Sequence, residues 1–258
     1  MINLKRLFVP ICILFVLAGT SSYAQDKLYA MDADWEGTEL KKAKYLLRVK
    51  KINDTSWQWD SYAILGPLIK SETFKEEEGN IASGAVYFYN KNGRIDSIHN
   101  YRNGLAHGEW YYLNDTGRTV RLINYSNGIK VNERDLLAED AERKQKGALD
   151  SLDKNRGDKD EIESEFPGQN KGWAKYLSKN FNYPERAINN EIQGEVWIQF
   201  VVDTVGNVIE PRICKSVEFS LDEEALRIIR SSPRWEPAVQ FGRKVKSYKK
   251  QPIIFKLK

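Results

Sequence analysis

Few side chains in the sequence have the types and spacing that catalysis or metal binding requires. The two histidines, His99 and His107, are eight residues apart, and no cysteine or carboxylate joins them at the spacing of a metal site. The glycines of residues 168–172 lack the spacing of a phosphate-binding loop, and no Gly-x-Ser-x-Gly nucleophile elbow occurs. We therefore predict that the protein is not an enzyme and uses neither a cofactor nor a metal.

The N-terminus has the layout of a signal peptide. Lys5 and Arg6 precede an uncharged, mostly apolar run at residues 7–19, and small residues before Gln25 suit cleavage there. The apolar run is shorter than the roughly 20 residues that a membrane-spanning helix needs. We therefore expect residues 1–24 to be removed on export. An uncleaved inner-membrane anchor is the alternative.

Charge and cysteine content narrow the choice of partners. The formal net charge is +4. So small a net charge does not indicate a nucleic-acid-binding protein, because such binding needs a clustered basic stripe.

Cleavage would remove Cys12, and a lone Cys214 can form no internal disulfide. Its apolar neighbours predict a small buried residue.

A repeat occupies the middle of the chain. Residues 84–104 and 108–128 are offset by 24 positions and share nine identical residues. In each copy, aromatic and β-branched residues flank a turn that contains Gly93 or Gly117, which predicts a β-hairpin. A single hairpin cannot bury its aromatic face, so the units must stack. A degenerate upstream copy is marked by Trp59, Gly66 and Phe74.

The repeat pattern over residues 57–130 resembles MORN-type repeats, as found in YwqK-like proteins. The resemblance implies a scaffold of stacked β-hairpins, and we assign residues 25–130 to this repeat domain. On that basis the aromatic residues form the repeat core, and a ligand groove on their face is the alternative.

Residues 131–165 differ in composition from their neighbours. Aromatic residues are absent up to residue 165 and charged residues dominate. Leu137, Ala141, Ala148 and Leu152 form a thin helical stripe. We therefore predict a charged, partly helical linker whose charged side chains are solvated.

The C-terminal stretch, residues 166–258, predicts a small globular domain. The expected elements, in order, are a helix at 171–181, strands at 194–202 and 208–216, a second helix, and a final strand at 244–257. The second helix has an expected N-cap at Ser220 and a capping-box partner at Glu223. Pro211 places the second strand at a sheet edge or a bulge. Together with the repeats, the predicted fold class is α+β, with a small antiparallel three-stranded sheet and two helices.

Residues 166–258 carry a set of motifs in a fixed order. They are Asn182-Tyr183-Pro184-Glu185-Arg186-Ala187, Ile192-Gln193-Gly194-Glu195-Val196, Phe200-Val201-Val202-Asp203 with Gly206, Leu221-Asp222-Glu223-Glu224-Ala225-Leu226, Trp235-Glu236-Pro237-Ala238, Gly242, and Pro252-Ile253-Ile254-Phe255-Lys256-Leu257. This set resembles the C-terminal domain of TonB-type energy transducers.

The resemblance implies binding by strand addition, in which a TonB-box segment of an outer-membrane receptor pairs with the last strand of the sheet. The residues assigned to that edge are Ser247, Tyr248, Lys249, Gln251, Ile253, Ile254 and Phe255. The residues assigned to further contacts with the box are Asn180, Phe181, Asn182 and Tyr183. The family's Gln-Pro-Gln becomes Asn180-Phe181-Asn182 here, so the two amides are kept and the proline is lost.

The terminal strand is basic, with Arg243, Lys244, Lys246, Lys249, Lys250, Lys256 and Lys258. Lysine on an edge strand blocks aggregation. The alternative is attraction to an acidic partner segment or an anionic envelope polymer.

Two functional hypotheses follow from the resemblance. In the first, a periplasmic TonB-family protein binds outer-membrane TonB-dependent transporters during energy-dependent transport. In the second, a non-transducing envelope scaffold acts through its repeats on peptidoglycan or envelope proteins, and the C-terminal sheet is an adaptor or a homodimer interface. The expected loss of the N-terminal anchor, the altered Asn180-Phe181-Asn182 and a short linker nearly free of proline favour the second.

Overall fold

The computed structural model describes residues 26–145 and 161–257. The predicted signal peptide, residues 1–24, and the linker positions Ala148 and Leu152 lie outside the described residues. The chain divides into two compact units, Met1–Asp140 and Ala141–Lys258.

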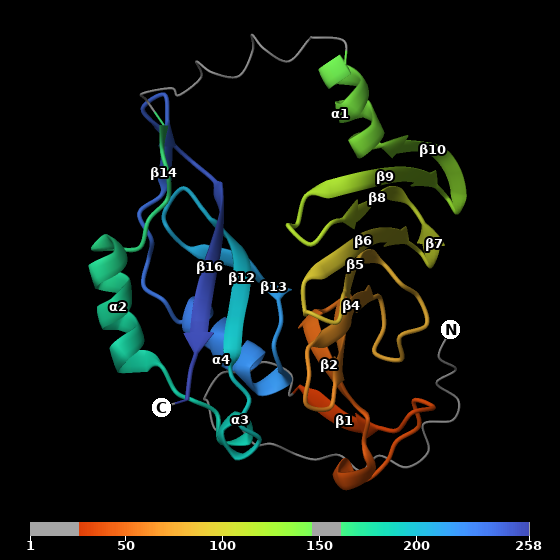
Figure 1. The fold of residues 1–258 in the computed structure, drawn as a ribbon, viewed down its shortest axis with the longest axis horizontal. Coiled ribbons are helices and arrows are strands. Elements are labelled where there is room, and N and C mark those ends of the chain that lie inside the picture. The colour runs from red at the N-terminus through yellow and green to blue at the C-terminus, as the bar shows by residue number, and fades with distance from the viewer. Residues whose placement is uncertain (1–25, 146–160, 258) are drawn as a thin grey trace. The chain divides into compact units, whose positions relative to one another are not determined.

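The first unit is built on one antiparallel sheet of ten strands (Figure 1). The strands are β1 Lys27–Met31, β2 Tyr45–Asn53, β3 Ser56–Ala63, β4 Leu68–Phe74, β5 Gly84–Tyr89, β6 Ile95–Arg102, β7 Leu105–Ala106, β8 Gly108–Leu113, β9 Thr119–Ser126 and β10 Ile129–Asp135. Their order follows the sequence, with β7 beside β6 and a 3₁₀ turn, Leu40–Lys42, between β1 and β2.

The predicted hairpins are confirmed. β5 pairs with β6, and β8 pairs with β9, at equivalent positions 24 residues apart. Gly93 and Gly117 have φ angles of 73° and 80°, which glycine adopts without strain. The upstream copy forms the β3–β4 hairpin, where the rings of Trp59 and Phe74 are 5.4 Å apart. Assignment of these hairpins to the MORN type stays a prediction.

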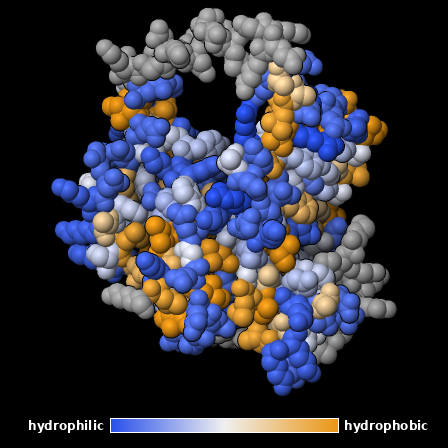
Figure 2. Space-filling view, viewed as in Figure 1, coloured by the Kyte–Doolittle hydropathy of each residue, from blue (hydrophilic) through white to orange (hydrophobic). Residues whose placement is uncertain are grey.

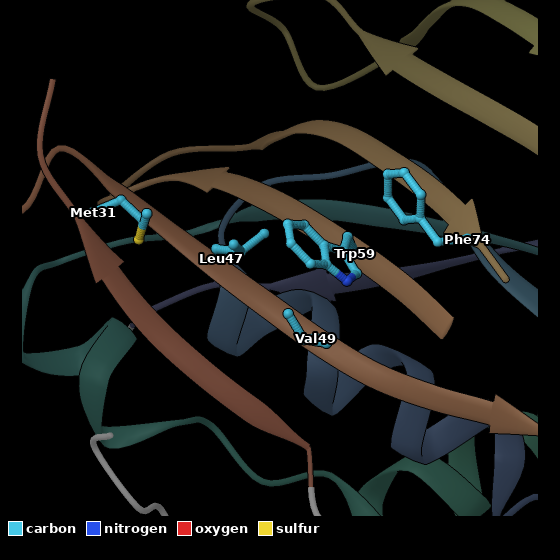
Figure 3. Packing of buried hydrophobic residues seen from close by; sticks show 5 residues of the cluster. All are labelled: Met31, Leu47, Val49, Trp59 and Phe74. Carbon is cyan, nitrogen blue, oxygen red and sulfur yellow. The ribbon is translucent and has the colours of Figure 1, made fainter. Parts of the chain in front are cut away.

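The apolar core of the first unit lies on the β1–β4 part of the sheet. Met31, Leu47, Val49, Trp59 and Phe74 form one buried cluster on a shared face (Figure 3). A single sheet layer leaves this face open, so loops must cover it. The loop after β4 does so, and the Trp59 indole donates a 3.1 Å hydrogen bond to a carbonyl of that loop.

The sheet continues beyond residue 130, where the linker was expected to begin. Residues up to Asp135 belong to β10, which pairs with β9, and α1 Leu136–Gln145 follows directly. The Asp135 carboxylate accepts hydrogen bonds from the N–H groups of Leu137 and Ala138 and so caps the helix. Pairing with the open edge of β9 explains the strand despite its polar side chains.

The second unit contains two three-stranded sheets and three helices among its described residues. One sheet has the order β13-β12-β16, from β12 Gly194–Val202, β13 Val208–Lys215 and β16 Ser247–Phe255. The other joins β11 Glu161–Ile162, β14 Ala238–Gln240 and β15 Arg243–Val245. The helices are α2 Gln169–Asn180, α3 Glu185–Asn189 and α4 Phe219–Arg230.

These elements confirm the α+β class and the small antiparallel sheet, with differences in detail. The unit has a third helix, α3, and the final strand is interrupted at Lys246. The interruption arises because β15 pairs with β14 whereas β16 pairs with β12. β13 lies at an edge and its register shifts beside Pro211, as predicted.

α4 packs on β12 and β13 (Figure 1). Its residues Leu221, Ala225, Ile228 and Ile229 are fully buried, as the apolar spacing predicted. The predicted capping box is wrong, because the N-cap is Glu218, whose side chain accepts a 2.7 Å hydrogen bond from the N–H of Ser220.

Candidate functional site

β16 has a partner strand on one side only within the described ranges. It pairs with β12 over nine consecutive residues, from Gly194 opposite Phe255 to Val202 opposite Ser247, without a register shift. In the sheet order β13-β12-β16 it is an outer strand (Figure 1). An outer strand presents N–H and C=O groups that a further strand can satisfy.

The side chains of β16 alternate between two environments. Ile253 and Phe255 are each 1% exposed and belong to the core, and Lys249 and Gln251 share their face. On the opposite face, Tyr248 is 72% exposed and Ile254 is 65% exposed. All seven residues predicted for the edge thus lie on β16, but the side chains of Ile253 and Phe255 are buried and cannot contact a partner strand.

An aromatic cluster lies at the C-terminal end of β16. The ring of Phe181 is 5.1 Å from that of Phe255, and the ring of Tyr183 is 5.7 Å from Phe255 in an edge-on arrangement. The Tyr183 hydroxyl donates to the Ile192 carbonyl at 2.7 Å, and burial raises the pKa of this phenol. The structure therefore brings two of the four predicted box-contact residues to the strand end.

The two asparagines of this segment are arranged differently. The Asn180 amide donates to the Tyr176 carbonyl at 2.8 Å, so it bonds back onto α2. The N–H of Asn182 donates to the Glu224 carboxylate at 2.8 Å, and Arg227 donates to the Asn180 carbonyl at 2.5 Å. Three of the polar groups at these two positions thus have partners within the domain.

Sequence reasoning missed the residues that hold this segment. Glu224 is 7% exposed, and its carboxylate accepts from the Arg227 guanidinium at 2.7 and 2.8 Å. This hydrogen bond raises the pKa of Arg227. An acid and a base three residues apart on a helix are normally read as a solvated pair, and nothing local indicates that they also clamp a distant loop.

The N-terminal end of β16 lies beside a segment that was expected to be linker. The Ser164 and Ser247 hydroxyls are 2.8 Å apart, and the Lys249 ammonium is 3.4 Å from the Glu163 carboxylate. A pocket of about 220 Å³ lies here. Its lining is Glu161, Ile162, Glu163, Ser164, Ala238, Val239, Gln240, Val245, Ser247 and Tyr248.

The exposed side chains of β16 are both charged and apolar. In the space-filling view, hydrophilic residues cover most of the visible surface and hydrophobic residues form separate patches (Figure 2). Lys249 and Lys250 place two ammonium groups on adjacent residues of β16, one on each face. Tyr248 and Ile254 supply apolar surface beside them.

The edge strand lies within a sequence match to a known family. Residues 179–257 match the family model described as Gram-negative bacterial TonB protein C-terminal. A comparison with curated proteins found no match to the chain. The matched range contains β12, β13, α4 and β16 together with the aromatic cluster at the strand end. The sequence similarity to the TonB C-terminal family thus covers residues 179–257, less than half of the chain.

Proposed function

We propose that this protein binds TonB-box segments of outer-membrane receptors by strand addition to β16, in energy-dependent transport across the envelope. The matched family, a domain of energy transducers and not of enzymes, supports the general role. The observation that carries the specific proposal is the outer position of β16, which pairs only with β12 in the described part of the chain.

Strand addition suits the chemistry of this edge. Each backbone hydrogen bond contributes a net of about 0.5–1.5 kcal/mol, so a short added strand reaches useful affinity only with help from side-chain contacts. Tyr248 and Ile254 provide exposed apolar area on one face, and the pocket beside Ser247 and Tyr248 can receive a side chain. We place the interaction in the periplasm, where such receptor segments are exposed.

A second candidate is a non-transducing envelope scaffold that acts through the repeats. It is favoured by a row of half-buried rings across β5, β6, β8 and β9. His99 lies 4.8 Å from Phe88 and stacks on Trp110 at 3.9 Å, and Trp110 lies 4.5 Å from Tyr125. Such a row could bind peptidoglycan or an envelope protein.

Among the described residues, the structure contains no helix with the length and apolar character of a membrane span.

The direct test uses the full mature chain as bait for detergent-solubilised outer membranes. We expect it to recover TonB-dependent receptors, and a synthetic peptide copying the N-terminal segment of a recovered receptor should compete. The matched pair consists of two versions of that peptide. Each is N-methylated at every second residue, and the methylated positions in one version are the unmethylated positions in the other. In a strand, alternate N–H groups face the same neighbour, so one version should fail to compete and the other should succeed. Recovery of no receptor would turn attention to the repeats.

A further inference from the structure

Pro252 lies in the middle of β16, within the ladder formed with β12. It stands opposite Trp197, and the pairing runs through this position without a shift. Proline has no N–H, and inside a sheet it is tolerated on an outer strand where its nitrogen faces away from the neighbour. The nitrogen of Pro252 is therefore directed toward the open side of β16.

The residue opposite supplies an independent observation. The carbonyl of Trp197 accepts a hydrogen bond from the Cys214 thiol at 3.4 Å, and Cys214 belongs to β13 on the other side of β12. This carbonyl thus points toward β13 and away from β16. In the β12–β16 ladder, Trp197 and Pro252 form a pair that is not hydrogen-bonded.

Alternation then assigns every backbone group of the strand. In an antiparallel ladder, hydrogen-bonded and non-hydrogen-bonded pairs alternate. The residues bonded to β12 are Ser247, Lys249, Gln251, Ile253 and Phe255. The residues directed to the open side are Tyr248, Lys250, Pro252 and Ile254. Only three of those four have an N–H, and the Pro252 ring occupies the place of the missing hydrogen.

We propose that Pro252 confines strand addition to the Ser247–Gln251 half of the edge, where the partner pairs with Tyr248 and Lys250. This inference rests on the proposed function for the existence of a partner. The favoured half offers two complete donor–acceptor residues in an unbroken run. Beyond Pro252 only Ile254 offers both groups, and Phe181 packs on Phe255 at that end.

Charge identifies the kind of partner. Pairing of this half with a second copy of itself would set Lys249 and Lys250 against the same lysines, and like charges on paired strands are destabilising. An extended segment that carries acidic residues gains from the same lysines. The partner that fits is therefore an acidic extended segment of another protein.

The backbone assignment is tested first on the free full-length protein, by amide hydrogen exchange observed residue by residue with NMR. We expect the N–H groups of Lys250 and Ile254 to exchange rapidly, and those of Lys249, Gln251 and Ile253 to be protected. The reverse alternation would overturn the inference. No partner is present, so this outcome does not depend on the proposed function.

The choice of half is tested with two matched pairs of variants in the full chain. The probe is the receptor segment recovered in the capture experiment. K250P removes an outward N–H and K250A keeps it, and I254P and I254A form the equivalent pair. We expect K250P to bind about tenfold more weakly than K250A, because it loses one hydrogen bond to the partner. I254P should bind within about twofold of I254A on the same scale. A larger loss at position 254 than at position 250 would overturn the proposal.

Two controls keep these results interpretable. I253P removes an N–H bonded to β12, so it should lower the stability of the domain, whereas K250P should leave the melting temperature close to that of K250A. If no receptor is captured at all, the proposed function fails while the exchange pattern still decides the backbone assignment.

Discussion

The carboxylate of Asp222 and the hydroxyl of Ser216 lie 2.5 Å apart inside the C-terminal domain, where neither side chain reaches solvent. The carboxylate also accepts from the N–H of Val217 at 3.1 Å. It thereby ties the end of β13 to the first turn of α4. Burial dominates its electrostatics and, with Glu218 and Glu223 nearby, raises the pKa of Asp222 to about 8, although both hydrogen bonds act in the opposite direction.

Asp222 should make the domain less stable as pH rises from about 4 to about 8. Its folded pKa is raised above the unfolded value near 3.9, so the folded state binds the proton more tightly. The stabilisation is complete below the unfolded pKa near 3.9 and is lost as pH rises from there through about 8. D222N, which cannot ionise, should flatten this dependence. Urea unfolding of both proteins between pH 5 and pH 9 measures it, and an equal slope in the two would contradict the assignment.

A second prediction concerns the buried ion pair of the first unit. The Arg48 guanidinium donates to the Asp60 carboxylate, with Nε at 3.1 Å, and Gln58 donates to the same group at 2.9 Å. D60A removes the nearest carboxylate from an arginine that is 4% exposed. Breaking a buried pair in this way typically costs about 3–5 kcal/mol.

The matched control for D60A is D54A. Asp54 is 99% exposed and pairs with Lys51 at 3.1 Å, so its removal should cost below about 1 kcal/mol. Equilibrium unfolding followed by tryptophan fluorescence compares the two. Similar losses in both variants would mean that the Arg48–Asp60 pair contributes no more than a surface pair.

Local patterns in the sequence were sufficient to predict the elements that depend mainly on residues close together in the chain. The 24-residue offset and the turn glycines predicted the β5–β6 and β8–β9 hairpins, and the apolar spacing predicted the buried face of α4. The capping-box prediction failed because Ser220 is only one of the nearby residues that could cap the helix. Glu218 is fully buried, pairs with Arg186 at 2.6 Å, and takes the cap position through a contact 32 residues distant.

The strand of the candidate site could be predicted from the sequence, but the segments that surround it could not. A final strand within residues 244–257 and its basic character were predicted, but the alternation that buries Ile253 and Phe255 was not. β11 could not be predicted, since two residues carry no periodicity and form a strand only because β14 offers them an edge. The Glu224–Arg227 clamp on Asn182 has the same origin, because its two ends are 42 residues apart.

A third prediction separates steric contact from backbone strain. Gly79 and Gly104 have similar φ angles, 70° and 78°, so alanine is strained at either. A Cβ at Gly79 would lie 2.9 Å from the Trp59 ring, whereas a Cβ at Gly104 meets nothing within 4 Å. We expect G104A to cost about 1 kcal/mol and G79A to cost about 1–3 kcal/mol more, from displacement of a core tryptophan. Thermal melts of the two variants measure the difference, and equal losses would show that the loop yields freely around Trp59.

The last prediction concerns His99, which stacks on Trp110 with an interplanar angle of 6°. Burial lowers the pKa of this imidazole, and the opposing effect of Asp96 is smaller. Because the folded pKa lies below the unfolded value near 6.5, the unfolded state binds the proton more tightly. The stability of the first unit should therefore fall as pH drops below about 6.5, the opposite direction to that expected from Asp222. H99F keeps a ring on Trp110 and cannot be protonated, so it should remove this acid sensitivity. Near-ultraviolet circular dichroism of thermal unfolding at pH 5 and pH 7 follows the tryptophan environment directly. An acid shift of the same size in H99F and the native protein would assign the effect to another group.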